Sequence, residues 1–218
     1  MRFHLGVLWV ALAAILTAAE PVNQLTPQEK KDGYVLLFNG KNLDGWQGDP
    51  SLWSVQDGAI TGTTDSHPIQ ENTFLIYRER FSDFILRFDI KLRNHNSGVQ
   101  FRSTVLPKFV VTGYQADASE VGDRSAWGNF YEEKGRGRGV MKTEDEGWQR
   151  AKPLVRHGDW NSYEVLAQGS HMRLTFNGVE TIDLKDDKAK DGVIALQLHA
   201  GAPMRVDFRN IRLKVMLH

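Results

Sequence analysis

The segment 83–93 alternates apolar and charged side chains, and this alternation restricts the fold more than any other feature. Its even-numbered positions are all apolar and hold Phe84, Leu86, Phe88, Ile90 and Leu92. Arginine, aspartate and lysine fill most of the odd-numbered positions, with Ile85 as the exception. Because successive side chains of a strand point to opposite faces, the pattern predicts a strand with one buried and one hydrated face.

Short apolar segments of this kind recur along the chain between turn signals. Asn177-Gly178 and Asp57-Gly58 favour tight hairpins, and Gln168-Gly169-Ser170 favours another turn. The strands that we expect span residues 34–39, 52–56, 59–62, 73–78, 83–93, 97–104, 112–118, 129–133, 139–142, 160–168, 171–176, 179–184, 192–199 and 204–216. Many short strands without a long helical pattern predict an all-β fold, a two-sheet antiparallel β-sandwich of jelly-roll type.

Length and composition indicate one domain. The chain has 218 residues and no cysteine, which excludes disulfides, thiolate nucleophiles and Cys-ligated metal sites. A domain of this size buries a large enough hydrophobic core to be stable without disulfides or a structural metal. We expect residues 33–217 to form a single β-sandwich domain. Residues 20–32 form a linker or short helix before it, with Thr26 as the N-cap and Pro27 as the first helical residue.

The first 19 residues have the pattern of a secretory signal peptide. Arg2 supplies the positive charge, an apolar run from Leu5 to Leu16 is short for a membrane span, and Ala19 precedes a cleavage site. We therefore predict export, to the periplasm or the medium, without membrane attachment after cleavage. An uncleaved anchor is the alternative.

The charges of the chain cancel, with 27 Lys and Arg against 27 Asp and Glu. A net charge of zero gives no long-range attraction to nucleic acid, so we expect no nucleic-acid partner. The composition carries no signal for an oligomeric state.

Three expected strands carry polar side chains two residues apart on one face. These pairs are Gln100 and Arg102 in 97–104, Gln115 and Asp117 in 112–118, and Gln197 and His199 in 192–199. Such a face suits a polyhydroxylated ligand, whose hydroxyls need both donors and acceptors. Five tryptophans could stack on sugar rings: Trp46, Trp53, Trp127, Trp148 and Trp160. The alternative is that these polar residues are ordinary members of a hydrated face.

The interval 119–158 is rich in Gly, Glu and Arg, and its strand signals are weak. Long loops on a rigid sandwich commonly hold binding residues, although a solvated excursion without a role would have the same composition. Glu132 and Glu133 are adjacent, so only one of them can face a given site if they lie on a strand. The spacing of carboxylates along the chain matches no paired-carboxylate glycosidase and no calcium loop.

Several segments occur in a fixed order along the chain. They are YVLLFNGKNLDGW (34–46), WSVQDGAI (53–60), DFILRFDIKL (83–92), NSGVQFR (96–102), GYQAD (113–117), YEEKGRGR (131–138), DWNSY (159–163), LTFNG (174–178), GVIALQLH (192–199) and FRNIR (208–212). Together they resemble the 3-keto-disaccharide hydrolase domain family over roughly residues 33–215. The resemblance implies a concanavalin A-like sandwich, export in bacteria and action on glycosides oxidised at C3. It also makes Glu133 the match to the family's acid.

The polar face and the resemblance indicate the same candidate site. We predict His199 as the base, with Glu133 or Asp117 orienting it or acting as the acid. The predicted substrate-binding residues are Gln100, Arg102, Gln115, Tyr131, Arg138, Gln197 and Trp127. A ketone at C3 acidifies the C2 proton, so one base, one acid and a stabiliser of the enolate oxygen are enough.

The sequence requires no cofactor, although a divalent metal held by His199 and a carboxylate could help to stabilise the enolate. The expected partner is a carbohydrate substrate. Two other functions use the same fold: a non-catalytic carbohydrate-binding module, and a structural or partner-binding sandwich.

Overall fold

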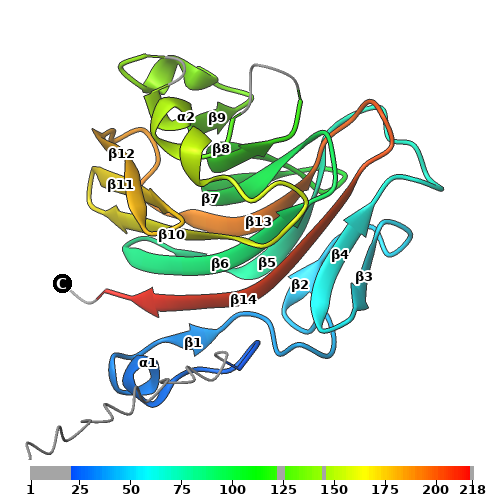
Figure 1. The fold of residues 1–218 in the computed structure, drawn as a ribbon, viewed down its shortest axis with the longest axis horizontal. Coiled ribbons are helices and arrows are strands. Elements are labelled where there is room, and N and C mark those ends of the chain that lie inside the picture. Colours follow the sequence, from blue (N-terminus) through cyan, green and yellow to red (C-terminus); the bar gives the residue numbers. More distant parts are fainter. Residues whose placement is uncertain (1–20, 122–125, 144–145, 217–218) are drawn as a thin grey trace, which may run out of the picture.

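The computed structural model describes residues 21–121, 126–143 and 146–216. Within these ranges the chain forms two antiparallel sheets that share one core, with only short helices (Figure 1). This confirms the predicted two-sheet sandwich. The predicted signal peptide, residues 1–19, lies outside the described residues. No helix in the described part of the chain is long and apolar enough to cross a membrane.

The larger sheet has eight strands. They are β1 (Val35–Leu36), β3 (Trp53–Gln56), β4 (Ala59–Thr63), β6 (Phe84–Leu92), β10 (Asn161–Gln168), β11 (His171–Phe176), β12 (Val179–Lys185) and β14 (Arg205–Val215). Their order is β12-β11-β10-β6-β14-β4-β3, and β1 pairs with β14. The strand expected over 34–39 is therefore only the short β1.

The smaller sheet has six strands and carries the candidate site. They are β2 (Trp46–Gln47), β5 (Thr73–Phe81), β7 (Asn96–Leu106), β8 (Val110–Ser119), β9 (Phe130–Glu133) and β13 (Gly192–Leu198). Their order is β2-β5-β13-β7-β8-β9, so β13 lies between strands that precede it by about a hundred residues in the chain. Residues from distant parts of the sequence therefore meet on one face.

Apolar side chains from both sheets form the core. The even-numbered residues of β6 are buried and the odd-numbered ones are partly exposed, as the alternation predicts. They pack against Val99 and Phe101 of β7 and against Ile194 and Leu196 of β13. Each such side chain stabilises the folded state by about 1.5–3 kcal/mol when it is removed from water.

The turns and the first helix follow the local sequence. Asn177-Gly178 has φ values of 45° and 84°, and Asp57-Gly58 has 49° and 73°, as two-residue hairpins with a left-handed turn require. Helix α1 (Pro27–Lys31) begins after Thr26, whose side chain accepts a hydrogen bond from the Glu29 N–H in a capping box.

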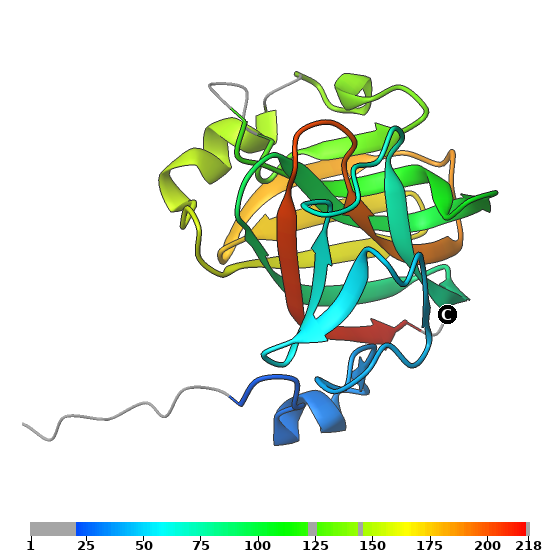
Figure 2. The ribbon, with the colours of Figure 1, turned by 90° about the vertical axis from the view of Figure 1, so that its right-hand side faces the viewer.

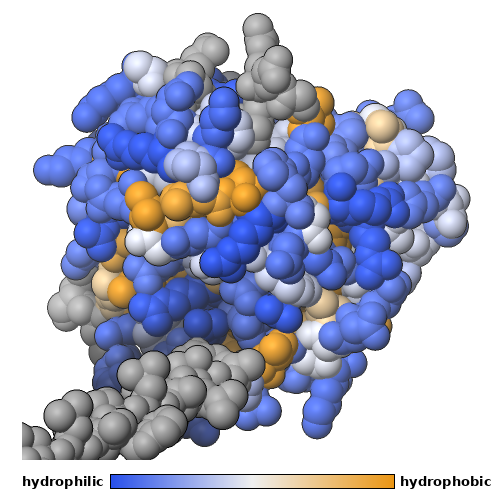
Figure 3. All heavy atoms as spheres, viewed as in Figure 1, coloured by the Kyte–Doolittle hydropathy of each residue, from blue (hydrophilic) through white to orange (hydrophobic). Residues whose placement is uncertain are grey.

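Figures 1 and 2 show that α1 lies on one side of the sandwich and the segment with β9 and α2 (Glu146–Ala151) lies on the opposite side. Hydrophilic residues cover most of the face seen in Figure 3, and hydrophobic ones form only small islands there.

One predicted strand, 139–142, is wrong. Residues Arg138–Val140 form a 3-10 helix, η2, and a second one, η3, follows at Lys152–Leu154. Gly137 precedes η2 with φ 60° and ψ −129°, a conformation that glycine tolerates far better than other residues. Gly137 pairs back with Glu132 of β9 across a tight turn, and η2 follows it directly.

A bulge in β7 reverses the predicted direction of Arg102. The pairing of β7 with β8 shifts between Phe101 and Thr104, and Arg102 adopts a φ of 47°. Such a bulge breaks the alternation of faces. The prediction that Arg102 shares the polar face with Gln100 is therefore wrong.

Arg102 instead connects the two sheets. Its guanidinium is fully buried and donates to the Asp83 carboxylate at 2.9 Å, to the Ser82 carbonyl at 2.7 Å and to the Gly169 carbonyl at 2.6 Å. Ser82 and Asp83 link β5 to β6, and Gly169 lies in the turn between β10 and β11. One side chain thus joins three segments of both sheets.

We expect Arg102→Ala to destabilise the fold by about 3–5 kcal/mol, because it leaves the buried Asp83 without its cation. Arg102→Lys should cost less, since it keeps the charge. Arg173→Ala is the matched control, because Arg173 pairs with Glu180 on the surface and should cost less than about 1 kcal/mol. Urea unfolding monitored by tryptophan fluorescence measures all three. Equal losses for Arg102→Ala and Arg173→Ala would contradict the role of Arg102.

Candidate active site

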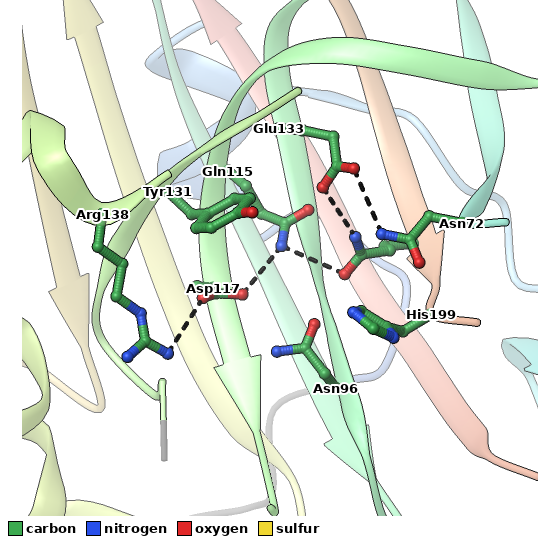
Figure 4. Close-up of a pocket in the computed structure, with 9 residues that line it drawn as sticks. Asn72, Asn96, Gln115, Asp117, Tyr131, Glu133, Arg138 and His199 are labelled. Atoms are coloured by element: carbon green, nitrogen blue, oxygen red, sulfur yellow. Dashed lines mark hydrogen bonds and ion pairs between the residues drawn. The ribbon is translucent and has the colours of Figure 1, made fainter. Parts of the chain in front are cut away.

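A polar pocket of about 330 Å³ lies on the outer face of the six-stranded sheet (Figure 4). It is lined by Asn72, Asn96, Gln115, Asp117, Tyr131, Glu133, Arg138, Gln197 and His199. These residues lie on or beside β5, β7, β8, β9, η2 and β13. The structure thus brings together all three predicted catalytic residues and four of the seven predicted binding residues.

Strand alternation places the pocket residues of β8 and β13. Tyr114 and Ala116 of β8 belong to the core, whereas Gln115 and Asp117 line the pocket. In β13, Leu196 lies in the core and Gln197 lines the pocket. The predicted faces of these two strands are therefore confirmed.

Glu132 and Glu133 occupy opposite faces of β9, as predicted. Glu133 accepts hydrogen bonds from the side-chain amides of Asn72 and Gln197, each at 3.3 Å. Glu132 forms ion pairs with Arg136 and Lys188 instead. Only Glu133 lines the pocket.

A chain of buried amides lies beneath the pocket. The Ser103 hydroxyl donates to Gln100 Oε1 at 2.9 Å, and Gln100 Nε2 donates to Gln115 Oε1 at 2.7 Å. All three residues are almost fully buried. Gln100, predicted as a binding residue, therefore lies beneath the pocket and supports Gln115.

The same chain ends on the two carboxyl groups. Gln115 Nε2 donates to Asp117 Oδ1 at 2.9 Å and to Gln197 Oε1 at 3.2 Å. Gln197 Nε2 then donates to Glu133. Because an ionised carboxylate only accepts hydrogen bonds, Glu133 orients each amide behind it.

Asp117 has the electrostatics of a proton donor. Burial raises its pKa to about 7, although the hydrogen bond from Gln115 and the charge of Arg138 lower it. A proton on Asp117 sits on Oδ2, because Oδ1 faces the N–H of Gln115. Oδ2 lies 4.0 Å from the Arg138 guanidinium. A carboxyl group with a pKa near neutrality suits general acid catalysis.

Glu133 experiences a weaker version of the same effect. Burial raises its pKa, while the hydrogen bond from Asn72 and the charge of His199 lower it. Two amides hold its oxygens in place. Glu133 thus offers a fixed acceptor for a ligand hydroxyl.

His199 has one ring nitrogen held by the backbone. Its Nδ1 lies 2.7 Å from the Ala200 carbonyl oxygen. A carbonyl only accepts, so Nδ1 carries a proton, and in the neutral form of the ring the lone pair is on Nε2. Figure 4 shows the ring on the pocket wall alongside Asn96. The His95 ring packs against it at a centroid distance of 4.9 Å.

The predicted stacking role of tryptophan is wrong. Trp127 is fully buried and packs against Phe176 and Tyr163, with centroid distances of 5.5 and 6.4 Å. Trp46 and Trp53 are also buried in the core. No tryptophan lines the pocket among the described residues; Tyr131 is the phenol-bearing side chain that does.

The sequence analysis missed two amides that line the pocket. Asn96 lies four residues before Gln100 in β7, so strand alternation places both on the same face and could have identified Asn96. Asn96 also belongs to a segment of the family resemblance. Asn72 lies just before β5 and gives no strand signal. Its Oδ1 accepts from the Ala200 N–H at 2.9 Å, which points its Nδ2 toward Glu133.

Within the described ranges, no group of three or more His, Cys, Asp or Glu side chains is close enough to hold a metal ion. The pocket offers one imidazole and two carboxyl groups among amides. A divalent ion shared by His199 and a carboxylate stays a prediction.

Solved structures share this fold. A candidate glycosyl hydrolase from Parabacteroides distasonis superposes with a TM-score of 0.66 at 24% identity, over 90% of this chain and 100% of that chain. The carbohydrate-binding module CBM66 from Bacillus subtilis gives a TM-score of 0.52 at 17% identity, over 77% and 94% of the two chains. These likenesses show a shared two-sheet β-sandwich fold.

The chain belongs to the family of 3-keto-alpha-glucoside-1,2-lyase-like domains, whose model matches residues 33–214. A 3-keto-disaccharide hydrolase from Bacteroides thetaiotaomicron is 31% identical over 100 residues, which is 41% of this chain. The match covers only 34% of that relative's length. The resemblance found in the sequence is thereby confirmed.

The raised pKa of Asp117 predicts a pH-dependent stability. A carboxyl group whose folded pKa of about 7 exceeds its unfolded value stabilises the fold below pH 4, and this contribution is lost as pH rises from about 4 to 7. The loss reaches at most about 1.4 kcal/mol per pH unit and then levels off. Wild type should therefore lose stability relative to Asp117→Asn over this range. Urea unfolding of both proteins from pH 4 to 8 measures the difference; a constant difference would contradict the prediction.

Proposed function

We propose that this protein cleaves glycosides whose sugar is oxidised to a ketone at C3. The family and the named relative support action on 3-keto-sugars. The ketone acidifies the proton on C2, because its loss gives a delocalised enolate. The site therefore needs a base at C2, donors for the enolate oxygen and an acid at the leaving oxygen.

The free Nε2 of His199 is the observation that carries the proposal. The Ala200 carbonyl fixes the orientation of the ring, so the lone pair of the neutral imidazole is on Nε2, and the ring lines the same pocket as Asp117. His199 takes the C2 proton, and the enolate oxygen accepts hydrogen bonds from the donors of Arg138 and Asn96. Arg102, which the sequence analysis predicted as a substrate-binding residue, forms the contact between the sheets instead.

Asp117 supplies the proton for the leaving group. As the C1–O bond breaks, the leaving oxygen takes the proton from Asp117 Oδ2, and a C1–C2 double bond forms in the sugar. Water then adds across this bond, which completes a net hydrolysis. Glu133, fixed by Asn72 and Gln197, accepts a hydrogen bond from a sugar hydroxyl.

We also propose export of the protein, to the periplasm or the medium. The proposal rests on the charge, apolar run and small residues of the first 19 positions.

His199→Ala should lower kcat for a 3-keto-glucoside at least about a hundredfold, the usual scale for loss of an acid–base group. His171→Ala is the matched control, because His171 pairs with Asp183 in the other sheet, and its kcat should equal that of wild type. The assay follows aglycone release from a 3-keto-glucoside and from its unoxidised parent. Release from the keto compound alone is expected.

A non-catalytic carbohydrate-binding module is the competing function, and CBM66 shows that this fold serves one. It predicts sugar binding without aglycone release across a panel of 3-keto-glycosides. That result, or an unchanged kcat in folded His199→Ala, would reject the proposed mechanism.

A further inference from the structure

A second pocket of about 430 Å³ lies on the outer face of the same sheet. It is lined by Gln47, Ile76, Tyr77, Arg78, Val105, Leu106, Lys108, Phe109 and Val193. We call it the hairpin pocket, because the β7–β8 hairpin supplies four of these residues. Its volume lies within the range of about 300–1,000 Å³ that is usual for small-molecule sites.

The hairpin pocket is distinct from the polar pocket. Val193 lines the former and Gln197 the latter, four positions further along β13. Four residues of a strand span about 13 Å. The two pockets share no lining residue.

Two irregular backbone segments converge on the hairpin pocket. The pairing of β5 with β13 jumps from Val193–Arg80 to Ala195–Ile76, which leaves extra residues in β5 that include Tyr77 and Arg78. Bulges of this kind are frequent beside functional sites, where they change the direction in which a side chain points. The first irregular segment therefore supplies an aromatic ring and a cation.

The second irregular segment is the hairpin tip. Lys108 and Phe109 have φ values of 61° and 56°, a left-handed conformation that is costly for residues other than glycine. The Phe109 carbonyl accepts from the Phe74 N–H at 2.9 Å, which ties the tip to β5. Backbone strain held in place in this way is concentrated at ligand sites.

The floor of the hairpin pocket is apolar. Ile76 and Val193 belong to a small cluster that is separate from the main core, and Phe109 packs against that cluster. Tyr77 also lines the pocket, but its ring packs against Trp46 and Phe81 of the main core. These surfaces favour a flat apolar group.

The rim of the hairpin pocket is positively charged. Arg78 and Lys108 are exposed, and neither forms an ion pair with a carboxylate of the described residues. The charge of Lys108 lowers the pKa of Glu71, but Glu71 forms its ion pair with Lys134, at 2.6 Å. Arginine and lysine side chains bind carboxylates through charge-assisted hydrogen bonds.

We propose that the hairpin pocket is a second ligand site, which binds a planar aromatic group bearing a carboxylate. The ring lies against Phe109 above Ile76 and Val193, and the carboxylate accepts hydrogen bonds from Arg78 and Lys108. This site does not depend on the reaction in the polar pocket.

Calorimetric titration with 2-naphthoate and with its neutral analogue 2-naphthamide tests the site. Wild type should bind 2-naphthoate more tightly than 2-naphthamide, and Arg78→Gln/Lys108→Gln should weaken 2-naphthoate at least about fivefold, since exposed charge pairs each contribute up to about 1 kcal/mol. Lys30→Gln on α1 removes a charge elsewhere and should change nothing. Absence of binding, or equal affinity in the double variant, would overturn the proposal.

Lys108→Gly separates a binding role from a structural one. It removes a charge and relieves a left-handed backbone, so it should raise Tm while weakening 2-naphthoate. His199→Ala should leave 2-naphthoate affinity unchanged, whether or not the protein cleaves keto-glycosides. Weaker binding in His199→Ala would place the ligand in the polar pocket and overturn the proposal.

Discussion

The alternation of side chains along β13 is the constraint on which the rest of the structure depends. This strand lies in the middle of the six-stranded sheet, so neighbouring strands bury it on both edges. Leu196 and its inward neighbours join the core. The outward residues change from Val193 and Ala195 to Gln197, so one strand supports an apolar pocket and a polar pocket. A slip of its register by one residue would turn the core residues of β13 outward and its pocket residues inward.

The polar pocket owes its chemistry to amides that are buried beneath it. A carboxyl group removed from water shifts toward its neutral form, and the N–H donors around it limit that shift. Burial raises the pKa of both Asp117 and Glu133, and it does so more strongly for Asp117, which is the more deeply buried of the two. A single pocket thereby holds two carboxyl groups with different proton affinities, and it also contains the imidazole of His199, whose Nδ1 is held by the backbone.

Irregular backbone does much of the positioning in this sandwich. The β7 bulge sends Arg102 across to the other sheet, where it joins three chain segments. The same break in alternation leaves Ser103 next to Gln100, beneath the polar pocket. Regular strands alone would have placed a cation in the pocket and left the contact between the sheets without its charge pair.

Local sequence patterns were enough to predict the fold class, the hairpins and the faces of regular strands, because alternation and turn preferences are local properties of the backbone. Alternation assigned Gln115 and Gln197 to one face, and the family resemblance added Glu133 to the same site. The direction of Arg102 and the burial of Trp127 could not be predicted in this way, because they follow from tertiary contacts. A bulge depends on the partner strand's register, and burial depends on what packs above a residue. Both arise from contacts between distant segments, which no local pattern encodes.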